Sequence, residues 1–429
     1  MLIEFKVENF RSFRESQTLS LISSNYEKSL PGNVIDRQLP GLASARYLRG
    51  AAVYGGNASG KSNLLEAIQF MAGFVRNSAT RLKPEDKTGA QPFLLDQDSR
   101  TRPSRFEVTF VISGVRYQYG FALTDERVTD EFLVAYPNGL AQRWFDRTYD
   151  QEDQTYVWSN SAAHFRLDKA LRDKTRANGL FLSVGPQFNN EQLAAVYNWF
   201  AQELRFLNLG GDAGLSPVYT ASVVEKSGEG LPRIMRLLQS ADFGVTGAAA
   251  ERKEIPMKQF TPEVLPQLDL AQFDKDGQTV SFYDVKVQHH AAGMPDQDLD
   301  FAQESAGTRR LFALAGPWID ILESGYTVFV DELETSLHPI LVRAFLQLLF
   351  CEQNNPNGAQ VIFTTHNPIL LDNTLLRRDQ VWFTEKGKDG ATHLYPLTDY
   401  KPRKGESLAK GYLSGRYGAI PFLPEGLKL

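Results

Sequence analysis

Residues 55–62, GGNASGKS, carry the clearest chemical signal in the sequence. They match G-x-x-x-x-G-K-[S/T] between an expected strand, AAVYG, and an expected helix, LLEAIQFMAGFV, which is the context that a phosphate-binding loop needs. Backbone N–H groups of such a loop converge on phosphates, Lys61 adds a positive charge, and the Ser62 hydroxyl coordinates Mg²⁺. We therefore expect a nucleoside triphosphate with Mg²⁺, bound by Gly55, Gly56, Asn57, Ala58, Ser59, Gly60, Lys61, Ser62 and Asn63.

Two carboxylates end an apolar run further along the chain. YTVFVDE, residues 326–332, is typical of a buried strand that delivers acids to its carboxyl end. Alone, the pair would be explained equally well by a strand that ends in solvent. Together with the phosphate loop, it places Asp331 near Mg²⁺ and makes Glu332 a candidate general base that polarises the attacking water.

Two further motifs also have ordinary explanations. ESAGTRR, residues 304–310, begins an expected helix, whose N-terminus could bind an anion near Ser305 and Gly307. Taken alone, Ser305 is better explained as only a helix cap. QVIFTTH ends an expected strand with His366, which is usually a polar terminus but in this order along the chain can reach a γ-phosphate.

The elements that would position these motifs indicate an α/β protein. LIEFKVENF alternates apolar and charged residues, as a half-buried strand does. Residues 106–135 are strongly strand-like and turn at Ser113-Gly114, the pattern of a two-residue hairpin. Residues 165–208 look mainly helical, and the clearest element of residues 211–275 is a helix around LPRIMRLLQSADF.

The C-terminal part alternates helix and strand. TVSFYDVKVQHH is an expected strand, and from Phe301 the order helix, strand, helix, strand predicts a parallel sheet with helices packed on it. Pro317 lies inside the first of these helices and should kink it or mark its break.

The composition excludes several classes of protein. The chain of 429 residues is 42% hydrophobic and 23% charged with a formal net charge of −5, so any contact with nucleic acid would need a local basic patch. Its one cysteine, Cys351, excludes an internal disulfide and is typical of a reducing compartment. No signal peptide or membrane-spanning segment is recognisable, so we expect a cytoplasmic protein without membrane contact.

In this order the motifs resemble those of the ABC-type ATPase superfamily. The start, IEFKVENFRSF, is similar to the SMC, Rad50 and RecF branch. ESAGTRRLFALAGP, DELETSLHP, TTHNP and the tail KGYLSGRYGAIPF resemble the prokaryotic AAA15/AAA_21 group, which includes ATPases related to overcoming-lysogenization-defect (OLD) proteins and abortive-infection systems.

The resemblance implies a P-loop ABC-type head: a mixed sheet with helices, an antiparallel β subdomain and a mainly helical insertion. The expected parts are residues 1–160 for the N-terminal half of the head, 161–275 for the insertion and 276–429 for the C-terminal half. Two ATP molecules would be sandwiched between two heads of a homodimer or higher homo-oligomer. Lys61 and Ser62 of one subunit would face Ser305 and Gly307 of the other.

The resemblance also assigns single residues. Glu332 becomes the catalytic base, His366 a sensor of the γ-phosphate, and Arg11 a contact of the nucleotide. For the glutamine of the family's Q-loop, Gln91 and Gln118 are both candidates.

Three positions lack an assigned role. Transporters carry an Asp in the loop after the Asp-Glu pair, whereas Ser336 and His338 fill that region here. Glu131 could replace the Q-loop glutamine, but a solvated charge is the favoured interpretation.

Between the two halves of the head no heptads appear, so a long coiled coil is not expected, and after His366 no acidic cluster of an OLD-type nuclease follows. The leading hypothesis is therefore an ATPase, converting ATP and water to ADP and phosphate, whose ATP-dependent dimerisation controls a separately encoded effector, such as a nuclease, in bacterial anti-phage defence. A nucleotide-gated scaffold with incidental hydrolysis is one alternative.

The other alternative is a RecF-like DNA-binding ATPase in DNA repair. DNA would then need a basic surface, for which the sequence offers one modest candidate, although a solvated helix face is the favoured interpretation. Its basic residues are Arg166, Lys169, Arg172, Lys174 and Arg176.

Overall fold

The computed structural model describes residues 1–41, 45–162, 165–208, 215–228, 230–241, 244–256, 271–273, 279–335, 337–403 and 405–420. Among them, no helix is long and apolar enough to cross a membrane. The chain forms two compact units. The larger unit contains Met1–Phe206, Gly325–Asp331 and Leu346–Leu429, and the smaller unit contains Leu207–Ser324 and Glu332–Phe345. The division into residues 1–160, 161–275 and 276–429 is based on the order of motifs along the chain, and it stays a prediction.

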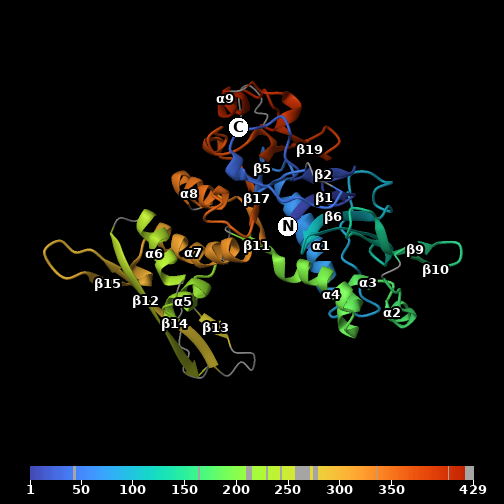
Figure 1. Ribbon diagram of the computed structural model, residues 1–429, viewed down its shortest axis with the longest axis horizontal. Helices are drawn as coiled ribbons and strands as arrows, with labels where there is room; N and C mark the ends of the chain where they lie inside the picture. Colours follow the sequence, from blue (N-terminus) through green and yellow to red (C-terminus); the bar gives the residue numbers. More distant parts are fainter. Residues whose placement is uncertain are drawn as a thin grey trace, which may run out of the picture. The chain divides into compact units, whose positions relative to one another are not determined.

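The larger unit contains a six-stranded sheet in the order β11-β16-β17-β5-β18-β19. Strands β11, β17, β5 and β19 of this sheet are labelled in Figure 1. β16, β17, β5 and β18 run parallel, and β19 returns antiparallel beside β18. β5 and β17 are buried along their whole length, as continuous apolar runs predict for parallel strands. The expected parallel sheet is thus confirmed. Its strands are β5 (Gly50–Gly55), β11 (Leu204–Asn208), β16 (Thr327–Asp331), β17 (Gln360–Thr365), β18 (Val381–Lys386) and β19 (Thr392–Pro396).

A seven-stranded antiparallel sheet in the order β10-β9-β8-β7-β6-β1-β2 forms the second layer of this unit. The expected hairpin joins β6 and β7, with both turn residues, Ser113 (φ 48°) and Gly114 (φ 81°), in the left-handed region that two-residue hairpins favour. The strands are β1 (Leu2–Glu8), β2 (Gln17–Ser20), β6 (Ser104–Ile112), β7 (Val115–Leu123), β8 (Val128–Tyr136), β9 (Gln142–Asp150) and β10 (Thr155–Ser159).

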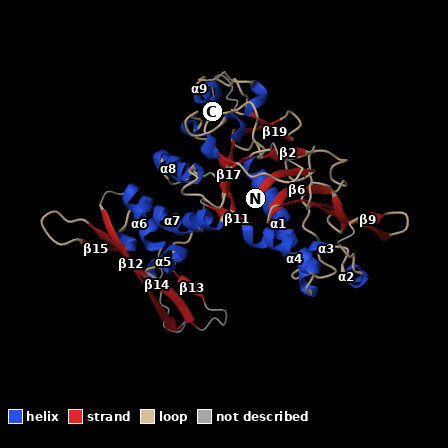
Figure 2. Ribbon diagram, viewed as in Figure 1, coloured by secondary structure: helices blue, strands red, loops and turns tan. Residues whose placement is uncertain are grey.

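Helix α1 (Lys61–Asn77) contacts strands of both sheets, so the helix that follows the phosphate loop lies in the middle of the unit. Leu64, Ile68 and Met71 on its buried face belong to one apolar core with residues of both sheets. The larger unit contains further helices and strands, and Figure 2 draws all helices in blue and all strands in red. These further elements are α2 (Lys169–Lys174), α3 (Phe181–Val184), α4 (Glu191–Asn198), α8 (Pro339–Phe350), which crosses from the smaller into the larger unit, α9 (Leu408–Leu413), β3 (Val34–Ile35) and β4 (Tyr47–Leu48).

Glu131 on β8 corrects an expectation, because it is not a solvated charge but is completely buried. Its carboxylate accepts hydrogen bonds from the backbone N–H groups of Phe181 (2.7 Å) and Leu182 (3.0 Å) and from the hydroxyl of Tyr119 (3.0 Å). The guanidinium of Arg147, also fully buried, lies 3.5 Å away. Burial raises the pKa of Glu131. The residue therefore fastens the start of α3 to the antiparallel sheet.

The smaller unit contains a second antiparallel sheet, in which β14 pairs with β12, β13 and β15. α5 packs on β12 and β14, and α7 packs on α5 and α6. β14 and α6 confirm the strand and the helix expected there. The elements are α5 (Val218–Glu225), α6 (Gly230–Ala241), β12 (Val245–Pro256), β13 (Ala271–Phe273), β14 (Thr279–His289), β15 (Gln297–Asp300) and α7 (Ala306–Ser324).

Pro317 does not end α7, which continues to Ser324. Proline has no N–H and cannot donate to the carbonyl of Ala313, four residues earlier. The buried hydroxyl of Thr220 on α5 lies 3.4 Å from that carbonyl and accepts a hydrogen bond from the N–H of Gly316 at 3.0 Å. A side chain from the neighbouring helix thus compensates for the missing donor, and a Cβ at Gly316 would lie only 2.7 Å from the Thr220 hydroxyl.

Candidate functional site

The phosphate loop connects the end of β5 to the start of α1, as its motif predicts. Ala58 (φ 61°) and Gly60 (φ 107°) have left-handed backbone conformations, which bend the chain sharply before the helix. The Lys61 ammonium donates hydrogen bonds to the carbonyls of Gly55 (2.9 Å) and Gly56 (3.0 Å). It thereby holds the loop closed, and the same cation is in place to bind phosphate oxygens.

Exposure differs along the loop. Asn57 and Ala58 are exposed, Gly56, Ser62 and Asn63 are half-buried, and Gly55, Ser59, Gly60 and Lys61 are buried. The Ser59 side chain is turned inward, with its Oγ 2.7 Å from Oγ1 of Thr384 on β18. Ser59 can therefore offer a nucleotide its backbone, whereas its hydroxyl is used inside the protein.

Arg11 lies beside the start of α1. Its Nε donates to Gln91 Oε1 at 2.7 Å, and its guanidinium forms an ion pair with Glu66 and a long contact (3.5 Å) with Asn63. The sequence predicts Arg11 and Gln91 as site residues for separate reasons. In the structure they are neighbours next to the phosphate loop. Gln118, the other Q-loop candidate, lies on β7, where it donates to Glu107.

Asp331, the last residue of β16, accepts a hydrogen bond from the hydroxyl of Thr364 on the neighbouring strand β17. β17 in turn pairs with β5, so Asp331 and the phosphate loop follow the same edge of one parallel sheet. A carboxylate and the half-buried Ser62 hydroxyl are oxygen ligands of the kind that Mg²⁺ prefers. These residues fit a magnesium ion bound together with a nucleotide.

His366 directly follows β17 at this edge and is exposed. The next residue, Asn367, caps a short 3₁₀ turn (Pro368–Leu370), and its carbonyl accepts a hydrogen bond from the hydroxyl of Tyr54 on β5 at 3.3 Å. The structure therefore brings Lys61, Asp331 and His366 to one edge of the larger unit's sheet.

The other predicted residues belong to the smaller unit. Ser305 caps α7, because its Oγ accepts a hydrogen bond from the N–H of Thr308 at 3.0 Å. Ser305 and Gly307 are nevertheless exposed at the start of this long helix. Glu332 is exposed as well, has a left-handed backbone (φ 47°), and contacts the hydroxyl of Thr335 at 3.3 Å.

The loop after Glu332 remains without an assigned role. His338 is exposed and accepts a hydrogen bond from the N–H of Ile340 at 3.3 Å. Ser336 lies outside the described residues.

The basic stretch of residues 166–176 is partly used inside the protein. Arg176 donates to the backbone carbonyl of Ser78 at 2.9 Å, and the Lys174 ammonium lies 3.9 Å from the centre of the Phe188 ring. Asp168 caps α2. The stretch therefore offers fewer free cations than its sequence suggests.

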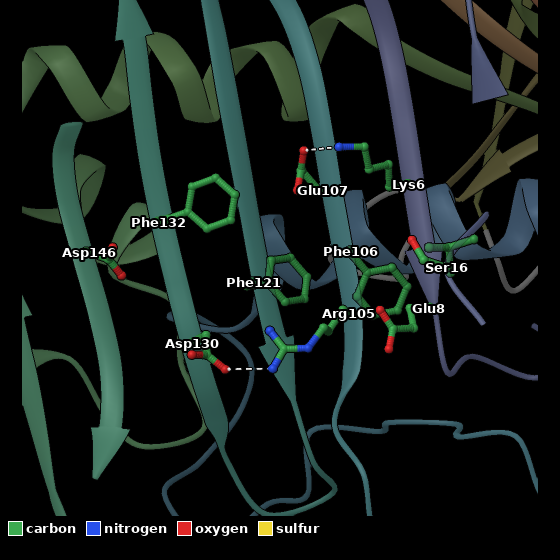
Figure 3. Close-up of a pocket in the computed structure, with 11 residues that line it drawn as sticks. Lys6, Glu8, Ser16, Arg105, Phe106, Glu107, Phe121, Asp130, Phe132 and Asp146 are labelled. Carbon is green, nitrogen blue, oxygen red and sulfur yellow. Dashed lines mark hydrogen bonds and ion pairs between the residues drawn. The ribbon is translucent and has the colours of Figure 1, made fainter. Parts of the chain in front are cut away.

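A cavity of about 200 Å³ opens on the antiparallel sheet (Figure 3). Four of its charged side chains pair across strands: Lys6 with Glu107 at 2.9 Å, and Arg105 with Asp130 at 3.6 Å. Its lining contains none of the phosphate-loop residues. We therefore do not assign the nucleotide to this cavity.

Three residues of these environments carry no signal in the sequence. They are two threonines and a histidine without a motif, and only the fold brings them to the loop or to the start of α7. They are His289, Thr384 and Thr392. Ser12, which contacts Thr392, belongs to the segment IEFKVENFRSF.

The model of one protein family matches residues 51–186 and 258–372, more than half of the chain. The family, AAA_21, is described as "AAA domain, putative AbiEii toxin, Type IV TA system". The chain therefore belongs to the AAA_21 family, which confirms the group expected from its motifs. Its architecture is the expected α/β one, and no curated protein matches it.

Two solved structures are similar over most of the chain. One is the Smc head domain of Pyrococcus furiosus with an extended coiled coil, bound to the C-terminal domain of ScpA. The two sequences are 12% identical, the match covers 93% of this chain and 97% of the Smc chain, and the TM-score is 0.41. The other is CbiO1 of Clostridium perfringens, part of the ABC transporter complex CbiONQ, with 12% identity, coverage of 93% and 90%, and a TM-score of 0.29.

Proposed function

We propose that the chain is an ATPase whose ATP-dependent dimerisation controls a separately encoded effector in bacterial anti-phage defence. The AAA_21 family supports the ATPase part, and the words "putative AbiEii toxin, Type IV TA system" in its description support a role in toxin control. The role in phage defence, the dimer and the effector are our extension.

The observation that best supports the proposed dimer is the exposed start of α7. Ser305 and Gly307 lie at the N-terminus of a helix that runs to Ser324, and their exposure leaves this positive helix end accessible to an anion. A phosphate loop and an exposed second helix start on one chain support a site completed by two copies.

In this proposal each residue has one role. Lys61 moves from the loop carbonyls to the phosphates, and Glu332 accepts a proton from the attacking water. His366 contacts the γ-phosphate, and Gln91, rather than Gln118, links the nucleotide to Arg11. A bound Mg²⁺, held through Ser62 and Asp331, would neutralise phosphate charge.

The test is the mass of the chain in solution with and without Mg-ATP. We expect Glu332→Gln to form ATP-dependent dimers that persist, because the nucleotide is bound but not hydrolysed. Lys61→Ala should bind no ATP and stay unchanged in mass. Gly307→Asp should bind ATP yet fail to dimerise, because it places a negative charge where the second subunit's nucleotide would lie. A Gly307→Asp variant that dimerises normally would contradict the shared site.

The effector is tested separately. A nuclease gene next to the gene for this chain, and loss of phage protection in Lys61→Ala cells, are the expected results. A neighbourhood of replication genes together with DNA-stimulated ATPase activity would contradict the role in defence. Full protection by Glu332→Gln would show that ATP binding rather than turnover is the output.

A further inference from the structure

The hairpin formed by β18 and β19 contacts the phosphate loop at Ser59. Ser59 Oγ lies 2.7 Å from Thr384 Oγ1 on β18, and the Ser59 carbonyl accepts a hydrogen bond from Thr392 Oγ1 on β19 at 2.9 Å. Thr384 is 0% and Thr392 is 1% exposed, so water does not replace either contact. The hydroxyl and the carbonyl of one loop residue are thus both bound by this hairpin.

The contacts continue to the N-terminal segment. Thr392 Oγ1 is 2.8 Å from Ser12 Oγ, and the N–H of Thr392 donates to the Ser12 carbonyl at 2.7 Å. Ser12 Oγ also accepts a hydrogen bond from Asn63 on α1 at 2.7 Å. Thr392 therefore connects the loop, the helix after it and the segment that carries Arg11.

The Ser59–Gly60 peptide explains why one hydroxyl can matter for phosphate binding. A trans peptide is planar, so its C=O and N–H point in opposite directions. When the Ser59 carbonyl points to Thr392, the Gly60 N–H points away from the hairpin. A Cβ at Gly60 would lie 2.3 Å from Thr392 Oγ1, which shows how closely the loop and the hairpin approach each other.

We infer that Thr392 is a positioning residue of the nucleotide site: its hydroxyl fixes the Ser59–Gly60 peptide so that the Gly60 N–H faces the phosphates. Thr384 supports the same loop residue through its side chain. The inference rests on the proposed function only in requiring that the loop binds a nucleoside triphosphate.

The test compares Thr392→Val with Thr392→Ser in the full chain. Valine keeps the shape of threonine but loses the hydroxyl, so we expect about tenfold weaker binding of Mg-ATP by calorimetry. Serine keeps the hydroxyl and should bind within about twofold of the unchanged chain. The turnover number at saturating ATP should change less than the affinity, because the catalytic groups are intact.

A matched control separates positioning from general destabilisation. Thr327 on β16 is also 1% exposed, and its hydroxyl lies 3.2 Å from Gln360 Oε1, within the same sheet but not on the loop. Thr327→Val should lower the unfolding temperature about as much as Thr392→Val while leaving ATP affinity unchanged. If Thr392→Val does not fold, Thr392→Ala, which also removes the hydroxyl that donates to the Ser59 carbonyl, should weaken binding in its place.

Three results would overturn the inference: unchanged ATP affinity in Thr392→Val or its substitute Thr392→Ala, equal losses in Thr392→Val and Thr392→Ser, or an equal loss in Thr327→Val. Failure of the unchanged chain to bind Mg-ATP would instead refute the proposed function.

Discussion

The Nε2 atom of His289 lies 2.7 Å from Oε1 of Glu304, the residue that directly precedes Ser305. His289 ends β14, and the side chain of Glu304 is only 4% exposed. The start of α7 is therefore tied to the sheet of the smaller unit through one buried carboxylate.

Removing the imidazole should disturb the helix start that we propose to bind the second subunit's nucleotide. In His289→Ala the Glu304 carboxylate loses its partner, at a cost of about 1–3 kcal/mol, and we expect weaker ATP-dependent dimerisation with unchanged ATP affinity of the monomer. His289→Gln can still donate to Glu304 and should restore dimerisation. His290→Ala is the control, because His290 is the exposed neighbour. Equal dimerisation defects in both alanine variants, measured by sedimentation, would contradict the role of His289.

Glu131→Gln should be strongly destabilising. It leaves the guanidinium of Arg147 buried without its counter-charge, and breaking such a pair costs about 3–5 kcal/mol. Asp130→Asn on the same strand is the control, because that pair with Arg105 is partly exposed and should contribute at most about 1 kcal/mol. Urea unfolding of both variants measures the difference, and similar midpoints would show that Glu131 is not a structural anchor.

Thr220→Val should cost about 1–2 kcal/mol in the free energy of unfolding, because the Ala313 carbonyl and the Gly316 N–H lose their hydroxyl partner. The same substitution should cost less in a Pro317→Ala background, since alanine restores the N–H that can donate to Ala313. A double-mutant cycle measures this coupling. Strictly additive effects would mean that Thr220 does not compensate for the proline.

Glu27 predicts a pH dependence of stability. Burial alone would raise its pKa, but hydrogen bonds from Arg378 and from Ser29 outweigh this and lower the pKa of Glu27 to about 2. A carboxylate with a lowered pKa stabilises the fold above its ordinary pKa of 4.5, and this contribution is lost as the pH falls from 4.5 towards 2. In Glu27→Gln, the urea concentration at the midpoint of unfolding should therefore change less between pH 4.5 and pH 2 than it does in the unchanged chain. The exposed Glu152→Gln should behave like the unchanged chain, and identical pH profiles for all three would refute the prediction.

The phosphate loop and the parallel strands could be predicted because their signals are local. The loop motif combines backbone geometry and charge within eight residues, and runs such as YTVFV before Asp331 or QVIFTT before His366 are apolar because both strands are buried. The hairpin at Ser113-Gly114 was equally local, since alternation on both sides of a two-residue turn specifies it.

The environments of the site could not be predicted because they depend on contacts between distant segments. Thr392 resembles any strand threonine until the fold places it against Ser12 and Ser59. From the sequence alone, Glu131 is expected to lie in solvent. Nothing near it in the chain indicates that the backbone N–H groups of Phe181 and Leu182 bind its carboxylate. β12 was missed because VTGAAAERKEIP has few β-branched or aromatic residues, and pairing with β14 overrides that weak preference.

The position of β5 between β17 and β18 has a consequence for how the protein is made. A ribosome completes the hairpins of β6 to β10 soon after each strand emerges, but both neighbours of β5 are synthesised only after the whole of Leu207–Ser324. Pairing between such distant segments forms late. A nascent chain thus already carries GGNASGKS while the strand that leads into it still lacks both partners, so nucleotide binding should begin only after β17 and β18 have been synthesised.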